Sequence, residues 1–294
     1  FVGFLPPLTN DKWIDYFKLY KAIPEFSEQN FNMSLSEFKV IFWWEWGHRQ
    51  LGRLIGLSVL LPIIFFSIKN GLSILKEYGL IFILVCLQGF IGWYMVSSGL
   101  IDRVDVSHYR LSLHLVTAFI ILSVVFWNFL KLTKIQTHYA SININLIKFF
   151  LFLLFLQLII GAFVSGMDAG KIYNTWPLMG LSYFPDDSQF IDFLNVSVFD
   201  NPSIVQFIHR NLAYLIVGFY IYILFFIIKD QNKIFRIPVV FMGASLFLQI
   251  ILGIFTILSG VKIFYASLHQ INSILIILST LYFLYITKYE EKTN

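Results

Sequence analysis

Long hydrophobic runs separated by short polar stretches dominate the chain, and seven of these runs reach the length that a bilayer requires. They cover residues 46–68, 79–98, 111–130, 146–165, 204–228, 237–259 and 267–287. A helix crosses the hydrocarbon core in about 20 residues, and a spanning backbone must satisfy its own hydrogen bonds. Barrel strands would be about ten residues long and strictly alternating, a pattern that these runs lack. The pattern therefore predicts an all-α integral membrane protein with seven spanning helices in this chain.

The composition supports this prediction. The chain is 58% hydrophobic and only 13% charged, against about 25% charged residues in soluble domains. Its net charge of +4 is better explained by membrane orientation than by nucleic-acid binding, so we expect no nucleic-acid partner. The one cysteine, Cys86, lies inside a hydrophobic run, which excludes an intramolecular disulfide and makes a cysteine metal site implausible.

Lysine and arginine are concentrated in one of the two sets of connections between the predicted helices. That set holds ten of them in about 35 residues, whereas the opposite set holds eight in about 100. The ten are Lys69, Lys76, Lys131, Lys134, Lys148, Lys229, Lys233, Arg236, Lys288 and Lys292. Because positive residues mark the cytoplasmic or matrix side, we expect the C-terminus inside and segments 1–44 and 166–203 outside. These outer segments are expected either to cap the outer face or to be solvated loops.

Two halves of the chain resemble each other. Histidines and a Gln-x-x-x-Gly pattern recur in the same order and at nearly constant separations, as parallel repeats do in membrane proteins. The matching positions are His48-Arg49 with His209-Arg210 and Gln88-x-x-x-Gly92 with Gln249-x-x-x-Gly253, both 161 residues apart, and His114 with His269, 155 residues apart.

The second half has one predicted helix more than the first. Residues 146–165, which carry Gln157-x-x-x-Gly161, precede its His-Arg helix, and nothing ahead of residue 46 matches them. The repeat therefore predicts a pseudo-twofold pair of four-helix transmembrane bundles, with seven of the eight helices present in this chain and the first one missing. We expect an N-terminal bundle over residues 1–133 and a C-terminal four-helix bundle over residues 134–294.

Four of the six histidines lie at one predicted depth in the membrane. His48, His114, His209 and His269 each fall near the start of a helix that begins on the outer side. The remaining two, His108 and His138, are expected in solvated loops. A lone histidine near a helix end is usually interfacial, but ionisable residues inside spans tend to mark function. Four at matched depth, paired by a repeat, predict metal ligands, because neutral imidazole is the commonest metal ligand.

The surroundings of these histidines favour haem over zinc. Zinc requires three or four ligands close together, and neither cysteines nor paired carboxylates assist here. Haem requires two axial ligands on facing helices and an apolar pocket, which helices rich in Phe, Leu and Ile provide. We therefore expect two haem sites, one in each half.

Charged residues accompany the histidines in both halves. The arginines are Arg49, Arg53 and Arg210. They are expected either to bind haem propionates or to snorkel to lipid headgroups, and Arg53, one turn deeper than Arg49, is harder to explain by snorkelling. Glu45, on the same helical face as His48, is matched by Gln206 in the second half. This asymmetry favours chemistry in the first half, although the helix dipole also favours a carboxylate near a helix start.

Six stretches of the chain carry long motifs. They are residues 42–53 (FWWEWGHRQLGR), 88–99 (QGFIGWYMVSSG), 107–114 (SHYRLSLH), 161–179 (GAFVSGMDAGKIYNTWPLM), 206–210 (QFIHR) and 269–270 (HQ). With these motifs the chain resembles, over essentially its whole length, the haem A synthase family, membrane enzymes that convert haem O to haem A for cytochrome oxidase. The family has eight spanning helices in two four-helix bundles. The chain lacks the cysteine pair of one branch and so resembles the branch found in mitochondria and related bacteria, which implies a bacterial plasma membrane or mitochondrial inner membrane.

The resemblance also implies roles for individual residues. His209 and His269 would hold a resident haem b, His48 and His114 would flank the substrate haem O, and Glu45 would be the important acid. The implied reaction oxidises one porphyrin methyl group to a formyl group in successive steps that need electrons and oxygen. The implied partners are haem O, the haem O synthase that supplies it, the lipid bilayer and an electron donor that the sequence does not identify. Whether the chain forms a homo-oligomer is left open at this point.

Two other functions are compatible with the same histidines. One is a di-haem b-type membrane cytochrome that exchanges electrons with quinone, against which the difference between Glu45 and Gln206 argues. The other is a transporter whose repeat-related histidines relay protons, and the haem content of the purified protein separates that case.

Overall fold

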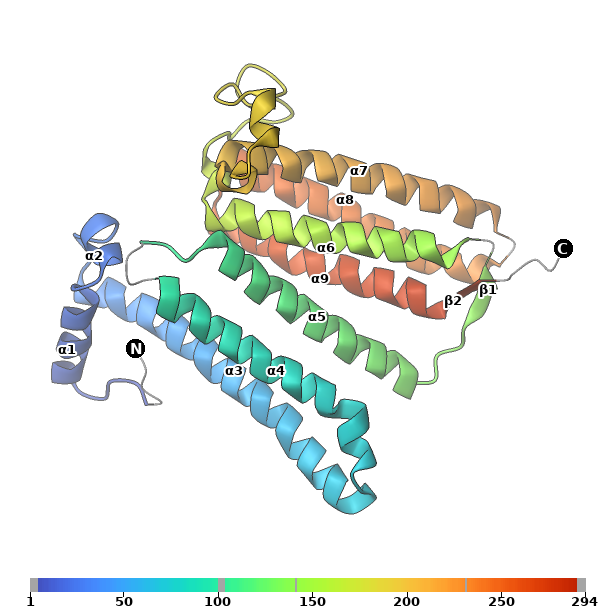
Figure 1. Cartoon of the computed structure of the whole chain (residues 1–294), viewed down its shortest axis with the longest axis horizontal. Helices are drawn as coiled ribbons and strands as arrows, with labels where there is room; N and C mark the ends of the chain where they lie inside the picture. The colour runs from blue at the N-terminus through green and yellow to red at the C-terminus, as the bar shows by residue number, and fades with distance from the viewer. Residues whose placement is uncertain (1–4, 100–103, 141, 231, 290–294) are drawn as a thin grey trace. The chain divides into compact units, whose positions relative to one another are not determined.

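The computed structural model describes residues 5–99, 104–140, 142–230 and 232–289. Within these residues, seven helices are long and apolar enough to cross a membrane, which confirms the predicted number of spans and the all-α membrane class. They are α3 (Leu35–Asn70), α4 (Ser73–Gly99), α5 (His108–Leu132), α6 (Ile144–Gly166), α7 (Pro202–Lys229), α8 (Arg236–Leu258) and α9 (Ile263–Ile286) (Figure 1).

Shorter elements occupy the connections. The α-helices among them are α1 (Asn10–Tyr20) and α2 (Pro24–Glu28), and the 3-10 helices are η1 (Ala169–Lys171), η2 (Phe190–Leu194), η3 (Val198–Asp200) and η4 (Lys233–Phe235). Strands β1 (His138–Ala140) and β2 (Thr287–Tyr289) pair in parallel and tie the α5–α6 connection to the end of α9. The expectation that His138 lies in a solvated loop is wrong, because it belongs to β1 and its ring centroid is 6.4 Å from that of Phe235.

The chain packs as two compact units, residues 1–110 and 111–294. Helix α5 joins the second unit, where Ser112 Oγ donates a hydrogen bond of 3.4 Å to the carbonyl of Ile159 on α6 and the rings of Trp127 and Tyr285 make an edge contact at 5.1 Å. The units thus divide the chain earlier than the boundary at 133/134 that the repeat suggests. That boundary, and the pseudo-twofold relation between bundles, stay predictions.

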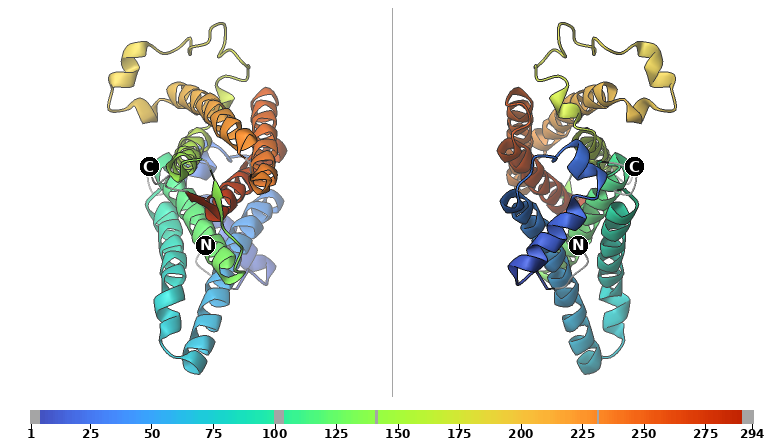
Figure 2. Two further views of the ribbon diagram at one scale, coloured as in Figure 1. Left: turned by 90° about the vertical axis from the view of Figure 1, so that its right-hand side faces the viewer. Right: turned by 90° about the vertical axis from the view of Figure 1, so that its left-hand side faces the viewer.

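In the second unit, α6, α7, α8 and α9 form a four-helix bundle in which each helix packs against its neighbours in the order α6–α7–α8–α9–α6 (Figure 1, Figure 2). Its core receives fully buried side chains from every helix, among them Phe150, Ile223, Met242 and Phe283. Between membrane-spanning helices such side chains stabilise the bundle through close van der Waals packing. The bundle therefore forms a packed frame around any group held between its helices.

In the first unit, α3 and α4 pack against each other, and α1 and α2 cover the start of α3 (Figure 1). Helix α3 begins at Leu35 rather than near residue 46, because Ser34 and Glu37 form a capping box there. Aromatic side chains fill the contact between α1 and α3, where the ring centroids of Trp13 and Phe42 lie 4.9 Å apart in a T-shaped arrangement. His48 consequently lies about three and a half turns into α3, not at its start.

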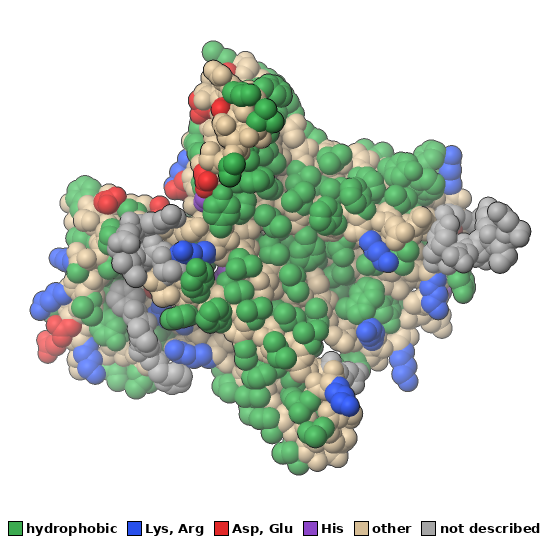
Figure 3. Space-filling view, viewed as in Figure 1, with side chains coloured by type: hydrophobic (Ala, Val, Ile, Leu, Met, Phe, Trp, Pro, Cys, Tyr) green, Lys and Arg blue, Asp and Glu red, His purple; other side chains and the backbone are tan. Residues whose placement is uncertain are grey.

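Charged side chains of the second unit segregate to opposite ends of its helices. Acidic side chains gather on the α6–α7 connection, residues 167–201, and Lys and Arg gather toward the far ends of the helices (Figure 3). Between them the helix surfaces are largely apolar. This distribution is the one expected of a membrane-spanning bundle. Lys292, one of the predicted inner residues, lies outside the described residues.

Candidate functional site

The second unit brings His209 of α7 and His269 of α9 together. Their ring centroids are 6.5 Å apart and their planes are inclined at 69°. Both rings line a cavity of about 310 Å³ between α6, α7, α8 and α9, whose walls are mainly aliphatic. Ligand sites in proteins typically measure about 300–1,000 Å³ and combine apolar walls with a few convergent polar groups. This cavity has the same character.

The Gln-x-x-x-Gly pattern seats each imidazole against a neighbouring helix. A methyl group added at Gly161 of α6 would lie 3.1 Å from Cε1 of His209, and one added at Gly253 of α8 would lie 3.0 Å from Cε1 of His269. Real Cβ contacts are seldom that close, so each glycine leaves the space that the ring occupies. In the second unit, the glycine of each Gln-x-x-x-Gly sequence thus leaves a notch that a histidine ring fills.

His269 is held through both ring nitrogens. Its Nδ1 lies 3.1 Å from the backbone carbonyl of Gln249, and the Gln249 side-chain amide lies 3.3 Å from its Nε2. Because a carbonyl can only accept, Nδ1 carries the proton and Nε2 is the unprotonated nitrogen. The buried Asn272 fixes the glutamine, donating to Gln249 Oε1 at 2.7 Å and to the Ser245 carbonyl at 2.8 Å.

His209 has a sparser set of contacts. The Gln157 amide lies 3.4 Å from its Nε2 and donates a bond of 3.0 Å to its backbone carbonyl. Its buried Nδ1 has no hydrogen-bond partner among the described residues. The hydrogen bonds of His209 and His269 therefore differ, although a Gln-x-x-x-Gly sequence faces each ring.

Arg210 and Gln206 hold the α6–α7 connection over the cavity. Arg210 donates to the carbonyls of Leu178 at 3.2 Å and Tyr173 at 3.1 Å, and the Gln206 amide donates to the same Tyr173 carbonyl at 3.1 Å. The predicted propionate ligand Arg210 thus lines the cavity while its terminal nitrogens bind loop carbonyls. Its Nε has no partner within the described ranges.

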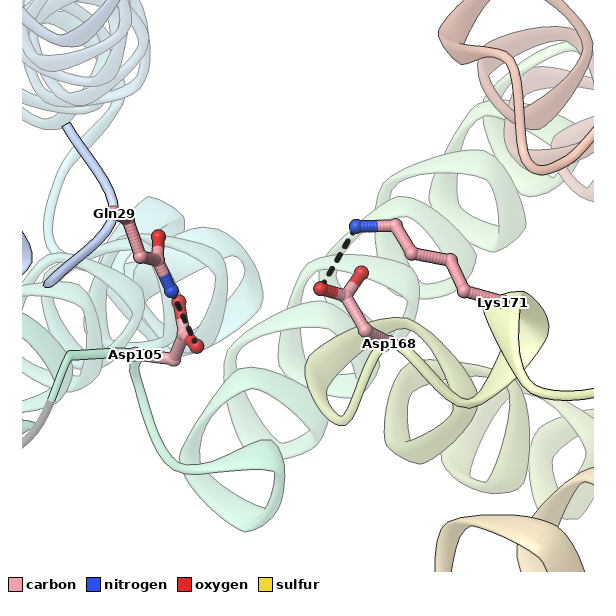
Figure 4. Close-up of polar contacts among 4 residues, drawn as sticks. All are labelled: Gln29, Asp105, Asp168 and Lys171. Carbon is pink, nitrogen blue, oxygen red and sulfur yellow. Dashed lines mark hydrogen bonds and ion pairs between the residues drawn. The ribbon is translucent and has the colours of Figure 1, made fainter. Parts of the chain in front are cut away.

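The sequence analysis missed several residues that close this end of the cavity. Trp176 Nε1 donates to the Tyr214 hydroxyl at 3.1 Å, and Asn174 donates to the Ile257 carbonyl of α8 at 3.0 Å. At the cavity rim, Lys171 pairs with Asp168 at 2.9 Å (Figure 4). The motif 161–179 runs from α6 into the connection of residues 167–201, and these contacts place that connection as a cover over the cavity.

Further out, Asp187 links the connection to the first turn of α7. Its carboxylate accepts a 2.7 Å bond from the Ser203 hydroxyl. Burial works against its ionisation, but hydrogen bonds with Ser203, Tyr173 and Ser188 outweigh burial and lower the pKa of the Asp187 carboxyl. Burial also raises the pKa of the Tyr173 hydroxyl, with Asp187 adding to the effect.

The predicted residues of the first half lie mainly on α3. Glu45 and Arg49 form an ion pair with 3.3 Å between Oε2 and Nη1, one helical turn apart. His48 and Arg53 are exposed. His114 lies on α5, half-buried in the second unit. Because His48 and His114 belong to different compact units, their pairing stays a prediction.

Polar contacts hold the segments of the first unit that lie around α1 and α2. Gln29 Nε2, after α2, donates to Asp105 Oδ2 at 3.2 Å (Figure 4), and the Tyr20 hydroxyl donates to Glu25 at 3.0 Å. Burial, followed by the bond to Glu25, raises the pKa of Tyr20 to about 12. His108, expected in a solvated loop, is instead the first residue of α5 and half-buried.

The histidine pair fits a group that takes two axial ligands. The rings of His209 and His269 lie 6.5 Å apart, centroid to centroid, and both line the apolar cavity, so these two residues would hold such a group. Among the described residues no group of three or more His, Cys, Asp or Glu side chains is placed to hold a metal ion. The donor set and the apolar cavity together suit haem better than zinc.

Comparison with known proteins assigns the family. Residues 1–281 match the family model described as cytochrome oxidase assembly protein. The chain belongs to this family. Its relatives include the haem A synthase of Pelagibacter ubique, 50% identical over 97% of the chain and 85% of the relative. Those of Maricaulis maris and Rhodopseudomonas palustris are 41% and 40% identical over 94% of the chain, covering 82% and 78% of the relatives. Family membership and the membrane-spanning bundle thus agree.

Proposed function

We propose that the chain is a haem A synthase, which oxidises a porphyrin methyl group of haem O to a formyl group and so supplies haem A for cytochrome c oxidase. The observation that carries the proposal is the match of nearly the whole chain to haem A synthases at up to 50% identity. The paired histidines and the apolar cavity of the second unit support it independently.

In this proposal, His209 and His269 hold a resident haem b in the cavity of the second unit. When bound, this group supplies one-electron transfer. Gly161 and Gly253 leave the space in which the two imidazoles are positioned. The cover of residues 167–201 limits access of water from the outer side. Keeping water out strengthens the electrostatic interactions inside the site.

The substrate half is proposed to use residues of α3 together with His114. His48 and His114 flank haem O, and Arg49 and Arg53 bind its carboxylates. Glu45 accepts or returns a proton near the methyl group that is oxidised. Its ion pair with Arg49 holds the carboxylate one turn before His48, on the same helical face.

The test is pigment analysis of membranes that contain the full-length protein together with a haem O synthase. The wild-type protein is expected to convert haem O to haem A. Glu45→Gln should still bind haem O but accumulate it or a partly oxidised alcohol, with conversion reduced about 10²- to 10⁴-fold, as for a lost acid–base group. Glu28→Gln on α2 is the matched control and should convert normally.

The same preparation separates the alternatives. If Glu45→Gln forms haem A at the wild-type rate, the catalytic role of Glu45 is wrong. If the wild-type protein carries haem but never converts haem O, the di-haem cytochrome becomes the better proposal, and a protein without any haem absorption would point to transport. Conversion of haem O at the wild-type rate by His48→Ala would remove His48 from the substrate site.

A further inference from the structure

We infer that the two histidines of the second unit are unequal ligands: His269 anchors the bound group, and His209 is the replaceable ligand. The inference rests on the proposed function, because it takes the cavity to hold a resident haem. It concerns how the chain holds that group, which neither the family match nor the relatives' names specify.

The two rings differ at Nδ1, the nitrogen that would not bind the metal. A metal-bound histidine usually donates its other N–H to a carbonyl or carboxylate, which fixes the ring and raises its basicity, and losing that partner typically costs 10- to 100-fold in metal affinity. His269 has such a partner, the Gln249 carbonyl at 3.1 Å. His209 Nδ1 is buried without a partner in the described part of the chain.

The hydrogen bond between His269 Nδ1 and the Gln249 carbonyl follows from the geometry of α8. The carbonyl of Gln249 points along α8 toward residue 253, four positions later. Because that residue is Gly253, no side chain covers the carbonyl, and the imidazole of His269 reaches it. The hydrogen bond and the notch thus depend on the same glycine.

The side chains of Gln249 and Gln157 are themselves held by different hydrogen bonds. Asn272, one turn after His269 on α9, ties down both the Gln249 side chain and the Ser245 carbonyl, and it is 4% exposed. On the other side, Gln157 donates to the backbone carbonyl of His209, and its own Oε1 has no partner among the residues described. Both glutamine amides thus contact a ring at Nε2, but only Gln249 also accepts from Nδ1 of its histidine, and only Gln249 is held in turn by Asn272.

The experiment compares His209→Gly with His269→Gly in the purified full-length protein, measuring haem per polypeptide, optical and EPR spin state, and response to added imidazole. We expect His209→Gly to retain most of its haem in a five-coordinate, high-spin form that imidazole returns to low spin. In His269→Gly the haem content per polypeptide should fall at least tenfold, because the remaining ligand, His209, lacks a hydrogen-bond partner for its second nitrogen.

A positioning role for Asn272 is tested by Asn272→Leu, which keeps a similar volume but removes both hydrogen bonds. It should increase the rate of haem loss about tenfold and change the low-spin EPR signal. The matched control is Asn128→Leu on α5, where the amide only bonds the Val124 carbonyl of its own helix and lies outside the cavity. It should leave both readouts unchanged.

The outcomes separate this inference from the function on which it rests. Equal haem loss in the two histidine variants, or greater loss in His209→Gly, overturns the inequality while leaving the resident haem in place. A wild-type protein that contains no haem overturns the resident-haem proposal and the inference with it. An unchanged EPR signal and haem-loss rate in Asn272→Leu would remove Asn272 from the support of His269.

Discussion

At the scale of single residues, the difference between Glu45 and Gln206 has a structural cause in the second half. Gln206 is 1% exposed and shares the Tyr173 carbonyl with Arg210. A carboxylate at this position would have no proton to donate to a carbonyl. It would instead attract Arg210, four residues later, as Glu45 attracts Arg49. The asymmetry therefore reflects a loop that must be held, and it does not by itself show that Glu45 is catalytic.

Gln206→Glu tests this explanation. The substitution should draw Arg210 into an ion pair and release the Tyr173 carbonyl, loosening the cover by about 1–3 kcal/mol, the cost of leaving a buried polar group unsatisfied. Hydrogen exchange of residues 173–178 should accelerate, while the reciprocal Glu45→Gln change should leave that segment protected. Unchanged protection in Gln206→Glu would show that the amide is not needed there.

The sequence indicated which residue types gather but not all of their partners. The histidine pair was predictable, because His209 and His269 both fall near the outer start of a predicted helix, and the structure brings their rings to 6.5 Å. The acceptors of Arg210 were not, since backbone carbonyls of a loop carry no side-chain signature. The role of Gly161 and Gly253 was visible as a pattern, but its meaning required the position of the imidazoles.

At the scale of elements, hydrophobicity located the seven spanning helices because lipid requires about 20 apolar residues from each. It misplaced the start of α3, since residues 35–45 include polar positions and are stabilised by a capping box and by the packing of α1. It gave no structure for residues 167–201. That segment is held by side-chain bonds to backbone groups, such as the one from Asn174 to Ile257, which leave no periodic pattern.

The same connection should depend on pH through Asp187. Its pKa lies below the ordinary value of 3.8 because hydrogen bonds, chiefly from Ser203, outweigh burial. A lowered folded-state pKa means that this contribution is complete above about pH 3.8 and is lost as the pH falls through the lower folded value. Limited proteolysis of the purified protein should therefore cut residues 180–200 faster below that pH. Asp187→Asn should be cut faster already at neutral pH, with a weaker pH dependence, and a wild-type-like profile in this variant would contradict the assignment.

At the scale of the whole molecule, the repeat and the packing divide the chain differently. The repeat groups α5 with α3 and α4, because His114 corresponds to His269. Packing groups α5 with the bundle of α6–α9, because Phe119 is buried in the same core as Phe150. Sequence correspondence records which helices are similar, whereas packing depends on which apolar faces meet. The similarity of the helices could be read from the spacing of the motifs, whereas their packing could not.

The orientation of the molecule in the membrane follows from charge and gives the last prediction. Lys and Arg cluster in the connections opposite residues 167–201, so that segment should face outward and the C-terminus inward. In a Cys86→Ser background, Val196→Cys places a thiol at a fully exposed position of the outer connection, and Lys134→Cys places one at an exposed position after α5. A membrane-impermeant maleimide should label Val196→Cys in intact cells or mitoplasts, and Lys134→Cys only after permeabilisation. The reverse labelling would put the covered end of the cavity on the inner side, and the prediction of an outward-facing site would then be wrong.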